Sequence, residues 1–461
     1  MEKAVFMSTA IVYVILFSLL AAMVIGTSKV RFLALFAGIV IFPLGISFLQ
    51  SPTVRPQDLF LYGFLFVICL REHEYIWDDF KAFPLKIPLL LILLCHFLSV
   101  YFNEGFKVKQ FYACTREFVE LYGYLFAAFV TTRRSSLTSI LKGLYSFTIV
   151  LCILGIFEIL LQGDYPYTYI CRAFPIYSGY HSLDTIVSCI RDYRIRAMVT
   201  TAHPTAYGTL LCCLFMLFVS QWNKPQWEKS KLILLYLLLT INLFISGSRT
   251  GMVCAILGAF LIFLHKRSII LKIALVGICF FLSVAYVNIA IDEFSKESQG
   301  SSLSMRQQQL LFTFFQIQSS PIIGNGTGFT KNVFDYDEEG RPINDADIGG
   351  LESIVFKTLI DYGFVGLAAY YLYDICLVVW FYRRRREAWA GPLGYQIVLI
   401  STLFFTLSGH IGNNTAFAFM IEGLLIGRLY RDEDHEISRD DEPETDTEEP
   451  ELIDSPENAD S

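Results

Sequence analysis

The sequence contains few charged residues for its length. Only 17% of its 461 residues are Asp, Glu, Lys or Arg, whereas soluble domains carry about 25%. Apolar residues make up 54% of the chain, and the mean hydropathy is +0.50. These values exclude an ordinary soluble domain. Apolar runs of about 20 residues, the length that crosses a ~30 Å hydrocarbon layer, recur between residues 4 and 430. The sequence therefore predicts an all-α, polytopic membrane protein.

Several signals of other protein classes are also missing. No small-residue cleavage site follows the first apolar run, so we predict a retained helix and no signal peptide. The glycines of residues 320–328 (SPIIGNGTG) lack the Gly-Lys-Ser/Thr and the strand-to-helix context of a phosphate loop. Their pattern favours a loop packed closely against its neighbours. Asp345 and Asp347 are spaced to hold a hard cation, but two such acids are common in an acidic loop. We expect no metal, no cofactor and no nucleic-acid partner.

Hydropathy predicts about thirteen transmembrane helices, with a range of about twelve to fourteen. We expect N-terminal helices in residues 1–161, an external loop at 162–201, and further helices in 202–290. A large external loop at 291–351 then precedes the C-terminal helices of 352–430. Residues 431–461 carry 15 acidic and 2 basic residues and no aromatic residue, which predicts a disordered tail. The predicted helices lie near 4–26, 31–50, 57–71, 84–102, 115–132, 138–161, 202–220, 231–247, 250–265, 269–290, 352–382, 393–410 and 413–430.

The short connectors rich in Lys and Arg predict the orientation of the helices. They all lie on one side in this count, which the positive-inside rule assigns to the cytoplasm. The acidic tail is then cytoplasmic, and the N-terminus and both long loops are external. The connectors are residues 29–31, 71–86, 131–134, 223–231, 265–267 and 383–386.

One arginine interrupts an otherwise uncharged stretch. Between Lys231 and His265 the only charged residue is Arg249, in the sequence ISGSRTGM of residues 245–252. A single helix over this stretch would measure roughly 50 Å at about 1.5 Å per residue, too long for one span. We predict a hairpin whose external turn carries Arg249. Its guanidinium offers planar donors that match phosphate oxygens, although a snorkelling interfacial arginine is the alternative.

Other cationic residues are predicted to lie at the same face. Arg191, Arg194 and Arg196 precede the helix start at His203-Pro204, and Arg306 lies in the large loop. Any one of them alone is more often a surface charge. Together they predict an anion-binding face, to which His203 could add a titratable group, although a lone interfacial histidine more often serves packing.

Three further predictions concern acids and thiols. Glu352 lies at a helix start near the water–membrane boundary, where a carboxylate can transfer protons; a favourable acidic residue in the first helical turn is the alternative. Lys357 and Asp361 are spaced i,i+4 and are predicted to neutralise each other. Cys171 and Cys189 share a polar loop, so they are the one plausible disulfide if that loop faces an oxidising compartment.

The order of these motifs resembles the O-antigen ligase and polymerase superfamily of bacterial envelope polysaccharide enzymes. The resemblance rests on RIRAMVTTAHPTAYGTLL (194–211), ISGSRTGMV (245–253), MRQQQLLFTFFQIQSSPIIGNGTGF (305–329) and ESIVFKTLIDYGFVGL (352–367). It covers residues 190–370 well and the first 160 only in hydropathy. The resemblance implies that Arg196 and Arg249 hold the pyrophosphate of a lipid-linked donor, and that Arg306 opens the large external loop. We expect Arg191, Arg194 and His203 beside them.

The resemblance also implies a function. We expect a glycosyltransferase of the bacterial inner membrane that uses an undecaprenyl-pyrophosphate glycan on the external face, in contact with membrane lipids and with other polysaccharide assembly proteins as partners. Ligase-like members carry His-Asn where this chain has Glu352-Ser353, a departure that favours a repeat-unit polymerase with Glu352 as a replacement base. A ligase acting on lipid A core or another acceptor is the close alternative. A transporter or flippase is the alternative from another class, but we see neither the discontinuous helices nor the internal repeats that are typical of transporters.

Overall fold

A computed structural model gives the structure of the chain. It describes residues 2–43, 46–50, 53–104, 107–162, 166–174, 190–191, 194–201, 203–264, 302–330, 351, 353–386, 388–408 and 414–440, with a few isolated positions between 268 and 278. The predicted helix at 269–290 and most of the two long loops lie outside these ranges.

Helices build nearly all of the described chain, which confirms the predicted all-α class. The elements in chain order are α1 (Glu2–Ile25), α2 (Ser28–Ile41), β1 (Leu49–Gln50), β2 (Thr53–Val54), α3 (Pro56–Arg71), α4 (His73–Ala82), α5 (Lys86–Glu104), α6 (Val108–Arg134), α7 (Leu137–Leu160), α8 (Pro166–Ala173), β3 (Ile190–Arg191), β4 (Arg194–Ile195), α10 (Pro204–Val219), α11 (Lys229–Ile245), α12 (Arg249–Phe263), α14 (Ser302–Ile317), α16 (Ile354–Arg383), α17 (Ala390–Ser408) and α18 (Asn414–Asp440). The described strands form two small antiparallel hairpins, β1–β2 and β3–β4.

Four of the described helices are long and apolar enough to cross a membrane. They lie at Lys86–Asn103, Leu137–Leu160, Ile354–Arg383 and Ala390–Ser408, and shorter apolar helices lie at Thr9–Ile25, Pro204–Val219 and Arg249–Phe263. The apolar helices support a helical membrane protein. The number of about thirteen spans remains a prediction.

Two predicted helix ends are wrong, and three helices lie outside the predicted spans. α4 occupies a predicted connector, and α8 and α14 lie inside the predicted external loops. α2 ends at Ile41, well before the predicted residue 50, because Pro43 follows and disfavours helical backbone in the residue before it. α18 continues to Asp440 and so enters the segment predicted to be disordered. A helix that is already formed in the bundle extends easily, because each added residue gains one backbone hydrogen bond.

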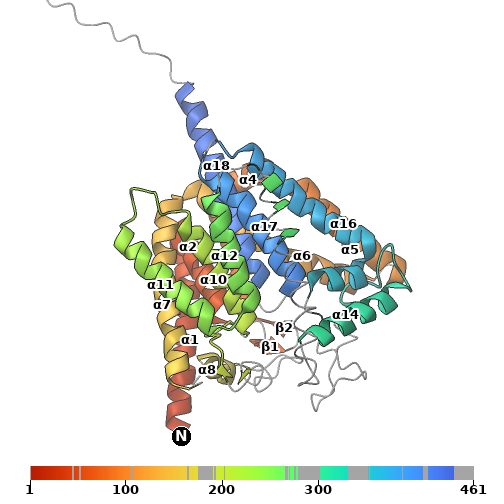
Figure 1. Cartoon of the computed structure of the whole chain (residues 1–461), viewed down its shortest axis with the longest axis horizontal. Helices are drawn as coiled ribbons and strands as arrows, with labels where there is room; N and C mark the ends of the chain where they lie inside the picture. Colours follow the sequence, from red (N-terminus) through yellow and green to blue (C-terminus); the bar gives the residue numbers. More distant parts are fainter. Residues whose placement is uncertain are drawn as a thin grey trace, which may run out of the picture.

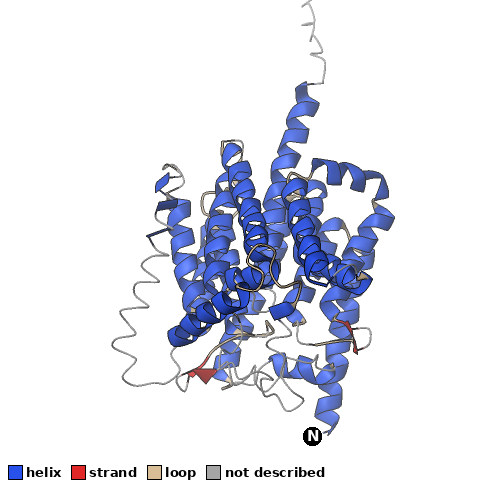
Figure 2. Cartoon of the chain, turned by 90° about the vertical axis from the view of Figure 1, so that its right-hand side faces the viewer, coloured by secondary structure: helices blue, strands red, loops and turns tan. Residues whose placement is uncertain are grey.

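The bundle has two different ends (Figures 1 and 2). One end, which we call the α4 end, carries α4 and the C-terminal part of α18. The opposite end, which we call the loop end, carries the N-terminus, α8, α14 and the β1–β2 hairpin. Ion pairs join three of the predicted cytoplasmic connectors at the α4 end: Arg31 pairs with Glu72, and Arg133 pairs with Asp79. These connectors therefore share one side, as the sequence predicts.

α16 is broken at Gly363, and a loop closes the break. Gly363 has φ +66° and ψ −166° inside the helix, a conformation that residues with a Cβ rarely adopt. The glycine-containing loop of residues 318–328 lies against this break and supplies the hydrogen bonds that the helix loses there. The four backbone bonds run from Asn325 N to Ile360 O (2.8 Å), Gly326 N to Asp361 O (3.0 Å), Phe364 N to Pro321 O (2.9 Å) and Val365 N to Ile322 O (3.1 Å).

This loop, which we call the clip, settles two sequence predictions. It is packed closely against its neighbours, as predicted: a Cβ placed on Gly324 would lie 2.3 Å from Tyr362 N. The N–H groups of Asn325 and Gly326 bind helix carbonyls, so they are not available to cradle a phosphate. The prediction that the chain has no discontinuous helix is wrong at α16. Sequence hydropathy missed the break because Ile354–Arg383 is apolar enough as a whole to form one span.

Candidate functional site at the loop end

The ISGSR segment forms the predicted helical hairpin. α11 ends at Ile245, Gly247 takes φ +60°, and α12 begins at Arg249. The Ser248 hydroxyl caps α12 by accepting a hydrogen bond from Gly251 N at 3.2 Å. Arg249 is exposed in the first turn of α12. Within the described part of the chain its side chain has no hydrogen bond and no ion pair, so its guanidinium can meet an incoming anion.

Arg196 lies directly against the same turn. The backbone N–H of Ala197 donates to Ile245 O at 3.0 Å, which fixes the segment after β4 to the end of α11. A Cβ placed on Gly247 would lie 2.7 Å from Arg196 Cδ. The glycine therefore leaves room for the arginine side chain as well as adopting a positive φ. Two arginines that are far apart in the sequence, Arg196 and Arg249, thus approach the same turn.

A buried carboxylate that sequence reasoning missed holds this segment in place. Glu158 of α7 is 1% exposed, and its Oε2 accepts hydrogen bonds from Met198 N (3.1 Å) and Val199 N (2.8 Å). Val199 has φ +52°, which is rare for a β-branched residue, so the segment needs such support. The sequence does contain a signal for Glu158, because it is an ionisable residue inside an apolar span. A charge in such a position costs free energy unless it is paired or has a function.

His203 caps the next helix with its imidazole ring, which accepts a hydrogen bond. Its Nδ1 accepts from Thr205 N at 3.1 Å at the start of α10. Burial, together with the positive charge of Arg196, lowers the pKa of His203 from 6.5 to about 4. The imidazole is therefore neutral near pH 7, and its proton is on Nε2 because Nδ1 is occupied as an acceptor. His203 can donate a hydrogen bond, but it is poorly suited to accept a proton.

The last turn of α17 links the hairpin to the start of α16. The Ser408 hydroxyl donates to Thr250 Oγ1 at 2.9 Å, and Thr250 follows the turn arginine. Two residues earlier in α17, Thr406 O accepts from the Ser353 hydroxyl at 2.8 Å. Ser353 caps α16 and follows Glu352 in the sequence. The end of α17 therefore binds Thr250 and Ser353, which are the sequence neighbours of the predicted catalytic residues Arg249 and Glu352.

Several predicted site residues are described only in part. Arg191 and Arg194 lie in the β3–β4 hairpin, which leads directly to Arg196, and Arg306 lies in α14; only their backbone is described. Glu352 itself lies outside the described residues, as do Asp345, Asp347 and Cys189. Cys171 is a buried free thiol in α8. The predicted disulfide between Cys171 and Cys189 is therefore not formed, and the role of Glu352 remains a prediction.

The charge of Lys357 acts on the Asp361 carboxylate, as the spacing predicts, but the direct contacts of each side chain are with other residues. Lys357 Nζ pairs with Glu117 Oε1 of α6 at 3.1 Å. The Asp361 carboxylate accepts from Thr330 N at 2.9 Å and from the Thr330 hydroxyl at 3.0 Å. The i,i+4 spacing places two side chains near each other, but partners from α6 and the segment after the clip compete with it. Sequence reasoning did not single out Glu117, although it is one of several charges inside an apolar segment.

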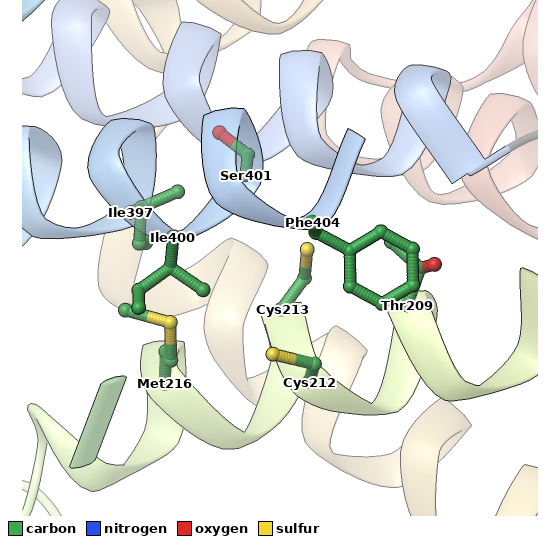
Figure 3. Close-up of a pocket in the computed structure, with 8 residues that line it drawn as sticks. All are labelled: Thr209, Cys212, Cys213, Met216, Ile397, Ile400, Ser401 and Phe404. Atoms are coloured by element: carbon green, nitrogen blue, oxygen red, sulfur yellow. The ribbon is translucent and has the colours of Figure 1, made fainter. Parts of the chain in front are cut away.

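The described part of the chain also contains a small pocket inside the bundle (Figure 3). It lies between α10 and α17 and is lined by Thr209, Cys212, Cys213, Met216, Ile397, Ile400, Ser401 and Phe404. Its lining has no charged side chain. It therefore offers nothing to hold a phosphate, and the cationic turn at the loop end is the better candidate.

The arrangement at the loop end suits an anion. A helix N-terminus presents backbone N–H groups and a partial positive charge, and α12 begins with an exposed arginine. Arg196 adds a second guanidinium, and guanidinium groups bind phosphate oxygens through two parallel hydrogen bonds. Among the described residues no group of three or more His, Cys, Asp or Glu could hold a metal ion.

Comparison with known families identifies the segment that contains most of these features. Residues 233–371 match the family model described as O-antigen ligase. The match confirms the resemblance to the O-antigen ligase and polymerase superfamily, whose members are glycosyltransferase-like ligases and polymerases. It covers the hairpin turn, the clip and the first part of α16. A comparison with curated proteins gave no match.

Proposed function

We propose that this member of the O-antigen ligase and polymerase superfamily polymerises oligosaccharide repeat units that are linked to undecaprenyl pyrophosphate. The reaction takes place at the loop end, on the external face of the bacterial inner membrane. The observation that carries the proposal is the exposed Arg249, which has no ion pair within the described residues and lies on the turn against which Arg196 packs. A doubly charged pyrophosphate matches such a pair of guanidinium groups.

The chemistry needs little beyond these groups. A hydroxyl of the acceptor glycan attacks the anomeric carbon of the donor sugar, and the bond from that carbon to the pyrophosphate oxygen breaks. The electron pair of that bond leaves with the pyrophosphate, whose developing charge Arg249 and Arg196 stabilise. Glu352 takes the proton of the attacking hydroxyl. Arg191, Arg194 and Arg306 add positive charge around the donor, and His203 adds a neutral hydrogen-bond donor.

The acid at the start of α16 favours a polymerase. Glu352-Ser353 stands where ligase-like relatives carry His-Asn, and Ser353 uses its hydroxyl to cap α16 and to bind Thr406 O. A ligase that transfers the finished polysaccharide to lipid A core or another acceptor is the second candidate, because the matching family model is described as O-antigen ligase. Both candidates use the same donor site. They differ in the acceptor.

A direct experiment tests the proposal. Purified protein is incubated with a lipid-linked repeat unit, and the products are separated by size. We expect products of two or more repeat units, and their loss in Arg249→Ala and Glu352→Gln. Absence of any longer product, with lipid-linked substrate bound but unchanged, would contradict the polymerase.

A deletion strain separates the two candidates. A polymerase predicts surface glycan with a single repeat unit and no ladder. Full-length polymer that persists on the lipid carrier would instead identify a ligase. Lipid-linked repeat units that accumulate on the cytoplasmic side would identify a transporter or flippase.

A further inference from the structure

A second polar cluster lies beside the start of α16, on the side of α5 and α6. Lys357 Nζ lies 3.1 Å from Glu117 Oε1, and the Tyr362 hydroxyl lies 3.5 Å from Glu117 Oε2. The carboxylate is thus held from two directions by groups of α16. It joins α6 to α16 through two residues that are 240 positions apart in the sequence.

This cluster can be reached from outside the bundle. The side chains of Lys357 and Glu117 are 27% and 25% exposed, so a ligand outside the bundle can reach them. Ionised groups near a bilayer are costly unless they face a wet cavity or serve a function. A partly exposed ion pair adds only modest stability, on the order of 1 kcal/mol. Stability alone therefore gives a weak reason for placing two charges here.

The surroundings of the cluster are polar and aromatic. The ring of His96 in α5 stacks on Tyr362 with centroids 3.8 Å apart and an angle of 6° between the rings. His96 is 9% exposed, and its Nδ1 has no hydrogen-bond partner among the described residues. The clip packs beside these residues: Asn103 Nδ2 donates to Gly324 O at 2.8 Å, and Thr327 Oγ1 lies 2.8 Å from the Cys114 thiol. Fixed donors and acceptors next to an aromatic ring suit a ligand rich in hydroxyl groups.

The cluster lies close to the proposed transfer site. Lys357 is one helical turn after Ser353, whose hydroxyl binds the end of α17. The same end of α17 holds Thr250 beside the turn arginine. A glycan that starts from a pyrophosphate at Arg249 and passes the start of α16 would therefore come next to Glu117 and Lys357.

We propose that Glu117, Lys357 and Tyr362 form a subsite for a sugar residue of the lipid-linked oligosaccharide, separate from the pyrophosphate site. The Glu117 carboxylate accepts hydrogen bonds from sugar hydroxyls, and the Lys357 ammonium donates to them. The subsite rests on the proposed function, because it recognises the glycan that Arg249 and Arg196 present. It deepens that function by assigning recognition of the sugars to α6 and α16.

The test compares two ligands on purified full-length protein in lipid nanodiscs. One is undecaprenyl pyrophosphate without sugars, and the other carries the oligosaccharide repeat unit. We expect Glu117→Gln and Lys357→Gln to weaken binding of the glycan-bearing lipid by about tenfold and to change binding of the bare lipid by less than about twofold. The double variant Glu117→Gln/Lys357→Gln removes both charges of the pair together, so it keeps the test valid if a single variant is unstable.

A matched control comes from the same helix. Glu120 lies one turn further along α6 in ion pairs with Arg116 and Arg55, and its side chain is 22% exposed. We expect Glu120→Gln to leave both affinities unchanged. Equal weakening of both ligands by Glu117→Gln, or no weakening of the glycan-bearing lipid in the double variant, would overturn the subsite. If instead the proposed function is wrong, Arg249→Ala should bind the bare lipid as tightly as the wild-type protein does.

Discussion

Arginines at the two ends of the bundle have different surroundings. At the α4 end, Arg31 Nη1 lies 2.7 Å from Glu72 Oε1, and Arg133 Nη1 lies 2.9 Å from Asp79 Oδ1. Arg134 pairs with both of these acids. At the loop end, Arg249 is exposed and has no acidic partner within the described residues. The arginines of the α4 end are neutralised by the protein itself, as is Arg55 beside the β1–β2 hairpin, which pairs with Asp58 and Glu120. Arg249 is left for an external anion.

The difference shows where positive charge has a structural role and where it can bind a ligand. Asp79 and Glu72 join α2, α3, α4 and α6 through side chains that are 5% and 14% exposed. Breaking such a buried pair is costly because a charge is left without a partner. An unpaired guanidinium at a helix N-terminus has the opposite character. It contributes nothing to holding helices together and attracts negative charge.

Removal of the unpaired arginine should give the largest loss of activity. We expect Arg249→Ala to slow chain extension by about 10²–10³-fold, the usual cost of losing one donor to a developing charge. Arg249→Lys should recover only part of the rate, because an ammonium keeps the charge and loses the bidentate geometry. The measurement is the initial rate of product formation on purified protein. A rate within threefold of wild type in Arg249→Ala would remove this residue from the donor site.

Disruption of the paired arginines should affect stability and leave activity intact. Asp79→Asn leaves two nearly buried guanidinium groups facing a neutral amide, and we expect it to lower the free energy of unfolding by about 3 kcal/mol. Thermal unfolding in detergent micelles measures this effect. Asp78→Asn is the matched control, since the neighbouring Asp78–Lys81 pair is 69% and 60% exposed; it should cost less than about 0.5 kcal/mol. If Asp79→Asn lowers the activity per folded molecule as much as Arg249→Ala does, the arginines of the two ends do not differ in function.

The support beneath Arg196 should have an intermediate effect. We expect Glu158→Ala to raise the KM for the lipid-linked donor about tenfold, because Met198 N and Val199 N lose their acceptor. Glu158→Gln should restore most of the affinity, since an amide oxygen can accept the same two bonds. A loss confined to protein yield, with unchanged KM, would show that Glu158 stabilises the fold without positioning the arginine.

The smallest effect concerns the pH dependence at the loop end. The pKa of His203 is about 4 in the folded protein, against 6.5 for a free imidazole. The unfolded chain therefore binds the extra proton first as the pH falls below 6.5, and stability decreases with falling pH. Between pH 6.5 and 5.5 the loss amounts to at most about 1 kcal/mol. His203→Asn keeps a capping side chain and should remove this decrease. Identical unfolding curves of the two proteins over this range would contradict the neutral imidazole.

The local sequence pattern was enough to predict the features that depend on neighbouring residues. The hairpin at Arg249 followed from small residues within an apolar stretch that is too long for one span. The start of α10 followed from His203-Pro204, since proline is favoured in the first turn of a helix. The packed character of the clip followed from glycines without the rest of a phosphate-loop motif. In each case the deciding interactions lie within a few residues along the chain.

Only the tertiary structure decided which distant groups meet. The sequence determined an all-α membrane protein with an arginine at a helical turn, because length, hydropathy and turn residues are local properties. It could not determine that Lys357 pairs with Glu117, that Glu158 holds the backbone before His203, or that the clip closes the break at Gly363. A buried charge or an open backbone group takes the partner that packing brings to it, and that partner can lie hundreds of residues away.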